Sequence, residues 1–409
     1  MPIGVAVIGR LADPEIQLAA FGGVIFPMSL IIESPVIMLL AASVALSNSP
    51  RNFKFLQRFS RILGVTFTGI HGLIAFTPLF DILVIPLIDP PEEVIEPARI
   101  GFQCMLPFTW AVAERRFHQG LLIRFGFQRK IGVGTLVRLL GMTGTILTLA
   151  LLAKRLDLHG AMVGATAISV GVIMEAIYVR ISALKVERGP LLAVDPDTPN
   201  IDLRRTLTFY IPLAMTSVIG LASQPIGSAG INRMPDALLS LAIWPALGGL
   251  GFLLRSSGIA FNEVVIRHAG DPESRVILRR FALVGGTLLS ILTIFFAIAP
   301  FAKIWFQDIE GLDSEMLELA QRAAWMMIPG PLFAFLASYW QGLLVNAHQT
   351  RPISEGVAVG LSITTIALII LATLDNMPGA IGASLAMTLG QGTQCIWLWI
   401  RVRTLVPKS

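Results

Sequence analysis

Ionisable side chains inside long apolar segments are the residues of this sequence best suited to chemistry. Arg255 lies about midway along one such segment, ALGGLGFLLRSSGIAFNEVVI. Burying a charge at membrane depth costs a few kcal/mol even on lenient scales, so such a residue is a functional candidate by default. A guanidinium holds a carboxylate or a phosphate through two donors. Arg255 therefore indicates either an anion-binding site or a structural ion pair.

Glu33 is the second intramembrane charge, and an internal alignment described below places it over Ser256, next to Arg255. Three interpretations stay open. Glu33 and Arg255 form a pair that breaks and re-forms during transport, Glu33 carries a coupled proton, or the pair is permanent and locks two lobes together. In the first two interpretations, Glu33 is both a substrate-binding and an ion-coupling candidate.

Three uncharged side chains extend the candidate site. Asn262 lies two helical turns beyond Arg255 on the same face, which would lengthen a polar stripe. Gln119 and Gln341 recur at matching positions, and each is followed by glycine. Substrate contact is one interpretation of the two glutamines, and helix packing, with glycine allowing close approach, is the other.

Two further residues are candidates for ion coupling. Glu175 lies about one helical turn before Arg180, and a local ion pair between them is the favoured structural alternative. His71 is isolated in an apolar helix, where a hydrogen-bonded structural histidine is favoured over a proton relay. The charged run 114–116 is predicted to be an anchor at the membrane interface.

Composition places these residues in a membrane protein. Hydrophobic residues make up 54% of the chain and charged residues 14%, whereas soluble domains have about 45–50% and about 25%. The two cysteines, Cys104 and Cys395, give neither a disulfide framework nor metal-ligand spacing. The sequence has no phosphate-binding loop, no His-Glu-x-x-His motif and no nucleophile elbow, so no enzyme, metal site or cofactor is predicted.

Apolar runs long enough to cross a bilayer predict an all-α integral membrane protein. Eleven spans are expected, near 18–47, 59–88, 98–122, 131–153, 160–183, 205–231, 238–266, 281–306, 320–346, 353–374 and 378–400. Alternate connections are rich in arginine and lysine, as in RNFKFLQRFSR from residue 51, and the others are acidic, as in DPPEEVIE from residue 89. The basic side is therefore cytoplasmic, with the C-terminus on it. The net charge of +5 reflects this topology, and no nucleic-acid partner is expected.

The sequence contains an internal duplication. PIGVAVIGR at 2–10 aligns with PIGSAGINR at 225–233, and QGLL at 119–122 aligns with QGLL at 341–344. The offset falls only from 223 residues at Pro2 to 219 residues at Gly160, which aligns with Gly379. Each copy holds six spans, so the copies are parallel repeats with the transport site expected between them.

The repeat predicts lobes at 1–183 and 204–409, joined by a cytoplasmic linker at 184–203. The first helix of the first copy is incomplete, because the apolar stretch 2–9 would span only about 12 Å. Either the native gene starts upstream or this copy has lost half a helix. The plan is therefore twelve spans with eleven complete.

The two six-helix lobes and their linker resemble the multidrug/oligosaccharidyl-lipid/polysaccharide exporter superfamily, which includes the multidrug and toxin extrusion (MATE) transporters. Within it, the chain looks most like the progressive ankylosis branch, through FYIPLAMTSVIGLASQPI at 209–226, AIWP at 242–245, YWQGLLVNAHQTRPI at 339–353 and GAIGASLAMTLGQG at 379–392. The major facilitator fold is the rival. Its Gly-x-x-x-Asp-Arg/Lys-x-Gly turn is replaced here by SNSPRNFKFLQR, which argues against it.

This resemblance implies a MATE-like secondary exporter working by alternating access at the plasma or inner membrane. The ankylosis branch and Arg255 favour a small anionic solute. Cationic drug efflux through Glu33, lipid-linked oligosaccharide flipping and a non-transporting membrane scaffold are the alternatives. A proton or sodium gradient would supply the energy, and the protein is expected to act in the lipid bilayer as a monomer.

Overall fold

A computed structural model describes residues 2–193, 200–298, 300–347 and 349–405, and every regular element in these ranges is a helix. By their internal contacts, the residues divide into two compact units. Unit 1 comprises Met1–Arg10, Ile88–Pro91 and Ile226–Ser409, and unit 2 comprises Leu11–Leu87 and Glu92–Pro225. The predicted all-α membrane fold is confirmed in its class.

The described part of the first half of the chain forms ten helices of very different lengths. They are α1 (Pro2–Ile8), α2 (Pro14–Leu18), α3 (Phe26–Ile37), α4 (Leu39–Leu46), α5 (Pro50–Phe76), α6 (Ile85–Ile88), α7 (Glu92–Cys104), α8 (Leu106–Arg124), α9 (Gln128–Leu156) and α10 (Gly160–Glu187). Two π-helical segments, η1 (Ala19–Ile25) and η2 (Phe80–Val84), lie among them.

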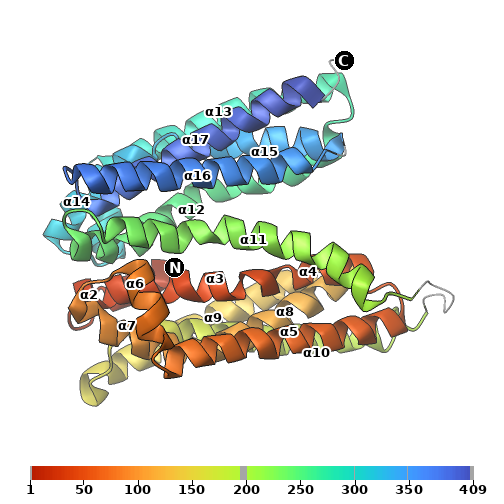
Figure 1. Ribbon diagram of the computed structural model, residues 1–409, viewed down its shortest axis with the longest axis horizontal. Helices are drawn as coiled ribbons and strands as arrows, with labels where there is room; N and C mark the ends of the chain where they lie inside the picture. The colour runs from red at the N-terminus through yellow and green to blue at the C-terminus, as the bar shows by residue number, and fades with distance from the viewer. Residues whose placement is uncertain (1, 194–199, 299, 348, 406–409) are drawn as a thin grey trace. The chain divides into compact units, whose positions relative to one another are not determined.

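The second half repeats this order with fewer interruptions. Its helices are α11 (Leu203–Ile231), α12 (Ala237–His268), α13 (Pro272–Ala297), α14 (Ser314–Met327), α15 (Gly330–Asn346), α16 (Arg351–Leu374) and α17 (Gly379–Leu405), with η3 (Lys303–Ile309) between α13 and α14. In unit 1, α13, α15, α16 and α17 lie side by side (Figure 1).

Prolines interrupt the first long span but not its counterpart. The segment Pro14–Leu46 has π-helical turns before Pro27, and α3 ends at Ile37 shortly after Pro35. Proline removes a backbone donor and clashes with the preceding turn, which explains the break. The counterpart, α12, continues through Pro245 as one helix of 32 residues.

Side-chain caps show that two helices begin before the predicted spans. The Ser49 side chain accepts a hydrogen bond from the Asn52 backbone N–H at the start of α5, and Asp271 caps α13 through the Ser274 N–H in the same way. Each cap precedes a proline, a residue favoured at the first helical position. The ranges 59–88 and 281–306 were therefore wrong, because the helices begin at Pro50 and Pro272 and end at Phe76 and Ala297.

Nine helices among the described residues are long and apolar enough to cross a membrane. The predicted spans 98–122 and 378–400 are not among them. The first divides at Met105 into α7 and α8, and the second is α17, whose Gln391 and Gln394 lower its apolarity. The chain is thus a multi-pass membrane protein, and the twelve-span plan stays a prediction.

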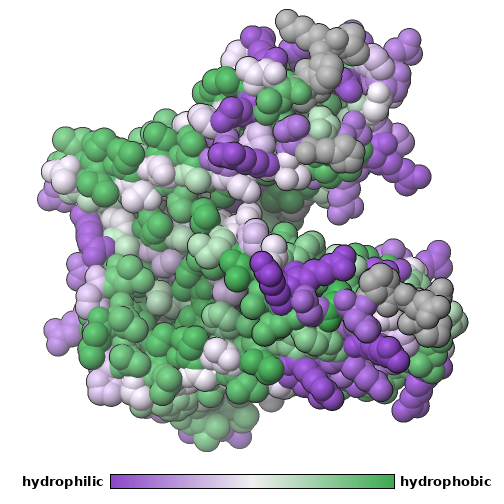
Figure 2. All heavy atoms as spheres, turned by 45° about the vertical axis from the view of Figure 1, so that its right-hand side comes forward, coloured by the Kyte–Doolittle hydropathy of each residue, from purple (hydrophilic) through white to green (hydrophobic). Residues whose placement is uncertain are grey.

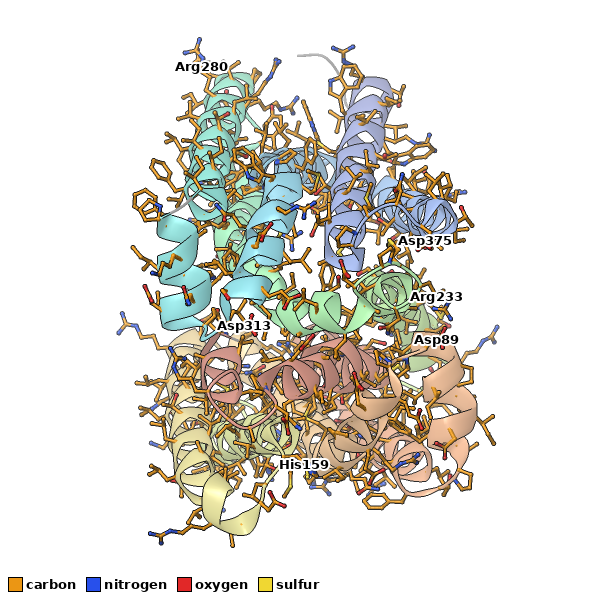
Figure 3. The ribbon with its side chains drawn as sticks, turned by 90° about the vertical axis from the view of Figure 1, so that its left-hand side faces the viewer. Asp89, His159, Arg233, Arg280, Asp313 and Asp375 are labelled. Carbon is orange, nitrogen blue, oxygen red and sulfur yellow. The ribbon has the colours of Figure 1, made fainter. Side chains whose placement is uncertain are left out.

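The surface of each unit has the pattern of a membrane protein. Hydrophobic side chains cover the middle of the helices, and hydrophilic side chains gather at the helix ends on the right of the view in Figure 2. Within unit 1, the basic Arg280 on α13 lies at the opposite end from the acidic Asp313 (Figure 3). This separation of basic and acidic ends agrees with the charge pattern of the connections.

The duplication is visible in side-chain packing. A Cβ atom on Gly134 would contact Val179 and Tyr178, and a Cβ atom on Gly356, its repeat counterpart, would contact Leu398 and Trp397 at the corresponding positions. Likewise, a Cβ on Gly171 would lie 2.9 Å from the Arg138 carbonyl oxygen, and one on Gly390 would lie 2.6 Å from that of Gly360. Equivalent helices therefore cross at equivalent residues.

The compact units differ from the predicted lobes in two segments. The residues up to Arg10 group with unit 1, and the first part of α11 groups with unit 2, where Tyr210 packs against Phe59 and donates a hydrogen bond to the Pro35 carbonyl oxygen. Residues 194–199 of the predicted linker lie outside the described residues. The linker and lobe boundaries stay predictions.

Candidate functional site

A cavity of about 380 Å³ with several polar side chains in its wall lies in unit 1, between α12, α15 and α17. Its polar lining consists of Arg255, Asn262, Ser338, Gln341, Gln391 and Gln394. Ile259, Phe333, Ala334 and Ala337 supply the apolar part of the wall. Small-molecule sites usually have volumes of about 300–1,000 Å³ and a few polar groups in an apolar wall, so this cavity has the dimensions of a ligand site.

Arg255 is the one charged side chain of the cavity lining, and it is half-buried. Its Nε donates a hydrogen bond to the Gly251 carbonyl oxygen over 3.0 Å, one helical turn earlier. It forms no ion pair with any residue in the described part of the chain. This arrangement fixes the side chain by one nitrogen, and the two terminal nitrogens have no hydrogen-bond partner among the described residues.

The structure brings three of the predicted binding residues together. Arg255 and Asn262 lie on the same face of α12, and Gln341 reaches the same cavity from α15. The Asn262 side-chain amide donates to the Ser338 carbonyl oxygen over 3.0 Å, which leaves the Asn262 side-chain oxygen as an acceptor. That these side chains bind a substrate stays a prediction.

Gln391 and Gln394 were missed in the sequence. Both come from α17 and line the cavity opposite α12. The repeat alignment carried the signal, since an offset of 219 residues places Gln394 on Glu175. A glutamine that replaces a charged residue within a membrane helix indicates a polar position inside the bundle and is therefore a candidate site residue.

At the corresponding place in unit 2, a charged cluster is centred on Glu175, whose side chain is 1% exposed. Arg115 donates to Glu175 over 2.9 Å, Gln119 donates to its other oxygen over 3.0 Å, and the Arg138 Nε lies 3.6 Å away. These partners come from α8 and α9, and each oxygen of the Glu175 carboxylate has at least one of them. Gln119, a predicted substrate contact, belongs to this cluster and not to the cavity.

Two predictions about these charges were wrong. Glu175 does not pair with Arg180, which pairs with Glu187 instead. Five residues along a helix correspond to about 140° of rotation, so the two side chains point apart. The run 114–116 is not simply an interfacial anchor either, because Arg115 is 7% exposed and faces the interior of the bundle. Hydropathy records charge but not the face of the helix that carries it.

Glu33 is also buried in unit 2, at 3% exposure. Its Oε2 has no hydrogen-bond partner among the described residues, and the charges that act on it are those of Arg115 and Arg116. Arg255 belongs to the other unit, so a pair between Glu33 and Arg255 stays a prediction.

His71 has a structural environment. One ring nitrogen lies 2.9 Å from the Thr109 hydroxyl and the other 3.0 Å from the Phe102 carbonyl oxygen. The ring also stacks on Phe102. Since a carbonyl can only accept, Nε2 carries a hydrogen, and Nδ1 of the neutral ring accepts from Thr109. Both nitrogens are used, which supports the structural alternative stated for this residue.

The glycines that follow the paired glutamines allow close helix approach, which was one of the two interpretations of the pair. A Cβ on Gly120 would lie 2.5 Å from the Leu40 carbonyl oxygen, and one on Gly342 would lie 2.5 Å from Val265 Cγ1. Both positions exclude a larger residue. Within the described ranges, no group of three or more histidine, cysteine, aspartate or glutamate side chains could hold a metal ion.

Comparison with solved structures identifies the fold. A multidrug resistance MATE family transporter of the MOP superfamily superposes with a TM-score of 0.74 at 15% identity, covering 99% of this chain and 94% of that chain. The lipid II flippase MurJ gives 0.72 at 14% identity, covering 98% and 85%. The eukaryotic MATE transporter AtDTX14 gives 0.67 at 13% identity, covering 100% and 94%.

The chain therefore has the MATE-like fold expected from its sequence. No protein-family model and no curated protein matches it. The specific resemblance to the progressive ankylosis branch stays a prediction.

Proposed function

We propose that this chain is a secondary active exporter that moves a small anionic solute out of the cytoplasm. One observation carries the proposal. Arg255 faces a cavity of about 380 Å³ whose lining includes no carboxylate, and it pairs with none of the described acidic residues. An unpaired guanidinium is costly in a membrane protein unless a ligand supplies the missing charge.

Alternating access between two lobes is the mechanism that accords with the fold. A proton or sodium gradient drives the exchange, and the chain works as a monomer in the plasma or inner membrane with its C-terminus in the cytoplasm. The basic connections support this orientation, because cytoplasmic loops carry the excess of lysine and arginine.

Cationic drug efflux is the competing function. The unpartnered Oε2 of the buried Glu33 favours it, since a carboxylate can hold a cation, and one similar structure is that of a multidrug resistance transporter. Arg115 and Arg116 weigh against this function, because their positive charges act on the same carboxylate.

Flipping of a lipid-linked oligosaccharide has less support. The lipid II flippase MurJ shares the fold. However, a lipid-linked sugar with its phosphates is expected to need a larger basic site than the single arginine of this cavity provides.

Uptake into inverted membrane vesicles tests the proposal. Labelled gluconate, labelled citrate and a cationic dye are offered under an imposed pH gradient and, separately, a sodium gradient. Arg255→Ala is compared with Arg280→Ala, which removes an exposed arginine of the same unit outside the cavity. We expect at least one anion to accumulate, Arg255→Ala to reduce its uptake by about tenfold or more, and Arg280→Ala to retain it.

Dye uptake that survives Arg255→Ala, with both anions ignored, would overturn the proposal. Glu33→Gln would then be the next variant. Loss of dye uptake in Glu33→Gln, with correct expression of the protein, would establish the cation exporter instead.

A further inference from the structure

The charge of the cavity lining limits what it can hold. Arg255 contributes one positive charge, and the other polar side chains, Asn262, Ser338, Gln341, Gln391 and Gln394, are neutral. One ionised group on a solute is therefore matched by one guanidinium. A second ionised group would have no charged partner in the lining, so the lining favours a singly charged solute.

The duplication shows which residues replace a carboxylate in this cavity lining. Glu175 in unit 2 corresponds to Gln394, and its two arginine partners, Arg115 and Arg138, correspond to Ala337 and Gly360. Gly360 lies against Gln394 as Arg138 lies against Glu175, because a Cβ on Gly360 would be 3.2 Å from Gln394 Cβ. Unit 1 therefore lacks both the carboxylate and the arginine side chains that fill this place in unit 2.

The carboxamides determine what else the solute carries. Each glutamine side chain both donates and accepts hydrogen bonds, and so does a hydroxyl group. A carboxylate or a phosphate only accepts, so three glutamines and Asn262 match hydroxyl groups better than further acidic groups. An alkyl chain would leave these amides without partners, which is also costly.

Arg255 and the carboxamides are close enough for one small molecule to touch both. A Cβ atom built on Gly330 would lie 3.7 Å from Arg255 Cδ and 3.6 Å from the Gln391 side-chain oxygen. The cavity has the volume of roughly a dozen water molecules. Phe333 and Ile259 offer apolar surface to a short carbon chain.

We propose that the cavity between α12, α15 and α17 binds a hydroxylated organic monoanion, a sugar acid by chemical class, and rejects polyanions. This selectivity rests on the proposed function for its role in transport, but binding can be measured without transport. Arg255 holds the carboxylate through its terminal nitrogens. Gln341, Gln391 and Gln394 bind the hydroxyl groups and determine specificity.

Calorimetric titration of the purified full chain in detergent tests the selectivity with four probes. Gluconate has one carboxylate and several hydroxyls, hexanoate lacks the hydroxyls, sorbitol lacks the charge, and citrate has extra charges. We expect gluconate to bind at least about tenfold more tightly than each of the others.

Two variants locate the effect. Gln394→Glu restores the carboxylate that unit 2 has at this place, so it should repel the anion and weaken gluconate binding by about tenfold or more. Gln349→Glu makes the same substitution at an exposed position outside the cavity and should leave binding unchanged. The thermal unfolding midpoint of each variant shows that it is folded.

Three results would overturn the inference for folded protein. These are citrate binding as tightly as gluconate, gluconate binding unaffected by Gln394→Glu, and no binding of any probe. Citrate export that depends on Arg255 would refute the monoanion selectivity and leave the proposed function intact. Export of the cationic dye alone would refute both.

Discussion

The two units build different polar interiors from one arrangement of helices. In unit 2, Arg115, Arg138 and Gln119 surround Glu175, and both oxygens of its carboxylate have a partner. In unit 1, the corresponding place is a cavity lined by glutamines, in which Arg255 is the one charged side chain and is unpaired among the described residues. The backbone contacts around both are equivalent, so side chains rather than helix positions make the difference.

This difference shows that a few side-chain replacements separate a buried ion cluster from a cavity with the dimensions of a ligand site. Replacing two arginines by alanine and glycine removes volume and charge together, and replacing glutamate by glutamine removes the anion they held. Replacing only the glutamate, or only the arginines, would leave a buried charge without its partner, and such a charge is strongly destabilising.

The largest expected effect comes from removing the Glu175 carboxylate of unit 2 while its arginine partners remain. Glu175→Gln would leave Arg115 buried without a counterion and lower the free energy of unfolding by about 3–5 kcal/mol. Chemical unfolding in detergent measures the loss. Glu263→Gln, the same substitution at an exposed position, should change the free energy by less than about 0.5 kcal/mol.

Removing the buried arginine together with the carboxylate should restore part of the stability. Arg115→Ala combined with Glu175→Gln copies the pair Ala337 and Gln394 of unit 1, so the double variant should be more stable than Glu175→Gln alone. A double variant as unstable as the sum of the single changes would show that the two residues are not coupled and would break the comparison.

A second contrast lies at Glu310, beyond η3, whose repeat counterpart is Ile88. Both side chains are fully buried. Burial raises the pKa of the Glu310 carboxyl from 4.5 to about 8, and the nearby Arg10 offsets this only in part. The unfolded chain therefore releases this proton first as pH rises. The contribution of this group to stability is complete below pH 4.5 and declines by about 4 kcal/mol as pH rises to about 8.

Unfolding of Glu310→Gln across this pH range measures the contribution. The variant should lose the decline, whereas Glu315→Gln at an exposed neighbouring position should keep it. A decline that is equally steep in both variants would assign the pH dependence to other groups.

The smallest expected effect concerns the paired glycines. Gly120→Ala and Gly342→Ala should each cost about 1–3 kcal/mol of unfolding free energy through overpacking. Gly120→Ala should cost more, because the Leu40 carbonyl oxygen is backbone, whereas Val265 can shift its side chain. Gly144→Ala in α9 meets open space and should be neutral or stabilising by up to about 1 kcal/mol. Equal stability of all three variants would contradict the proposed close packing.

The repeat was the most informative property of the sequence. Its steady offset predicted equivalent packing in both halves because helices that keep their contact residues keep their crossings, as Gly134 and Gly356 show. It also placed Gln341 among the candidates, and Gln341 lines one cavity with Arg255 and Asn262, which were chosen by charge and by helical spacing.

Hydropathy could not predict which charged side chains meet or where the helices begin. Arg115 and Glu175 are charged residues of different helices, and only the tertiary structure shows that they meet. Helix starts were misplaced for a similar reason, since the polar first turns after Ser49 and Asp271 hide the caps from a scan for apolar runs. Nothing in hydropathy distinguished Gln391 and Gln394, and only the structure shows that both line the cavity.

All non-glycine residues with positive φ in the described ranges are aspartates: Asp13, Asp89, Asp157, Asp236 and Asp375. Each is exposed, and each stands at a turn before or after a helix (Asp89 and Asp375 are labelled in Figure 3). The left-handed conformation costs other residues roughly 1–2 kcal/mol, and only glycine, asparagine and aspartate adopt it readily. A map of mutational tolerance would thus show five intolerant surface positions that never meet a solute, and intolerance alone would not distinguish them from the cavity.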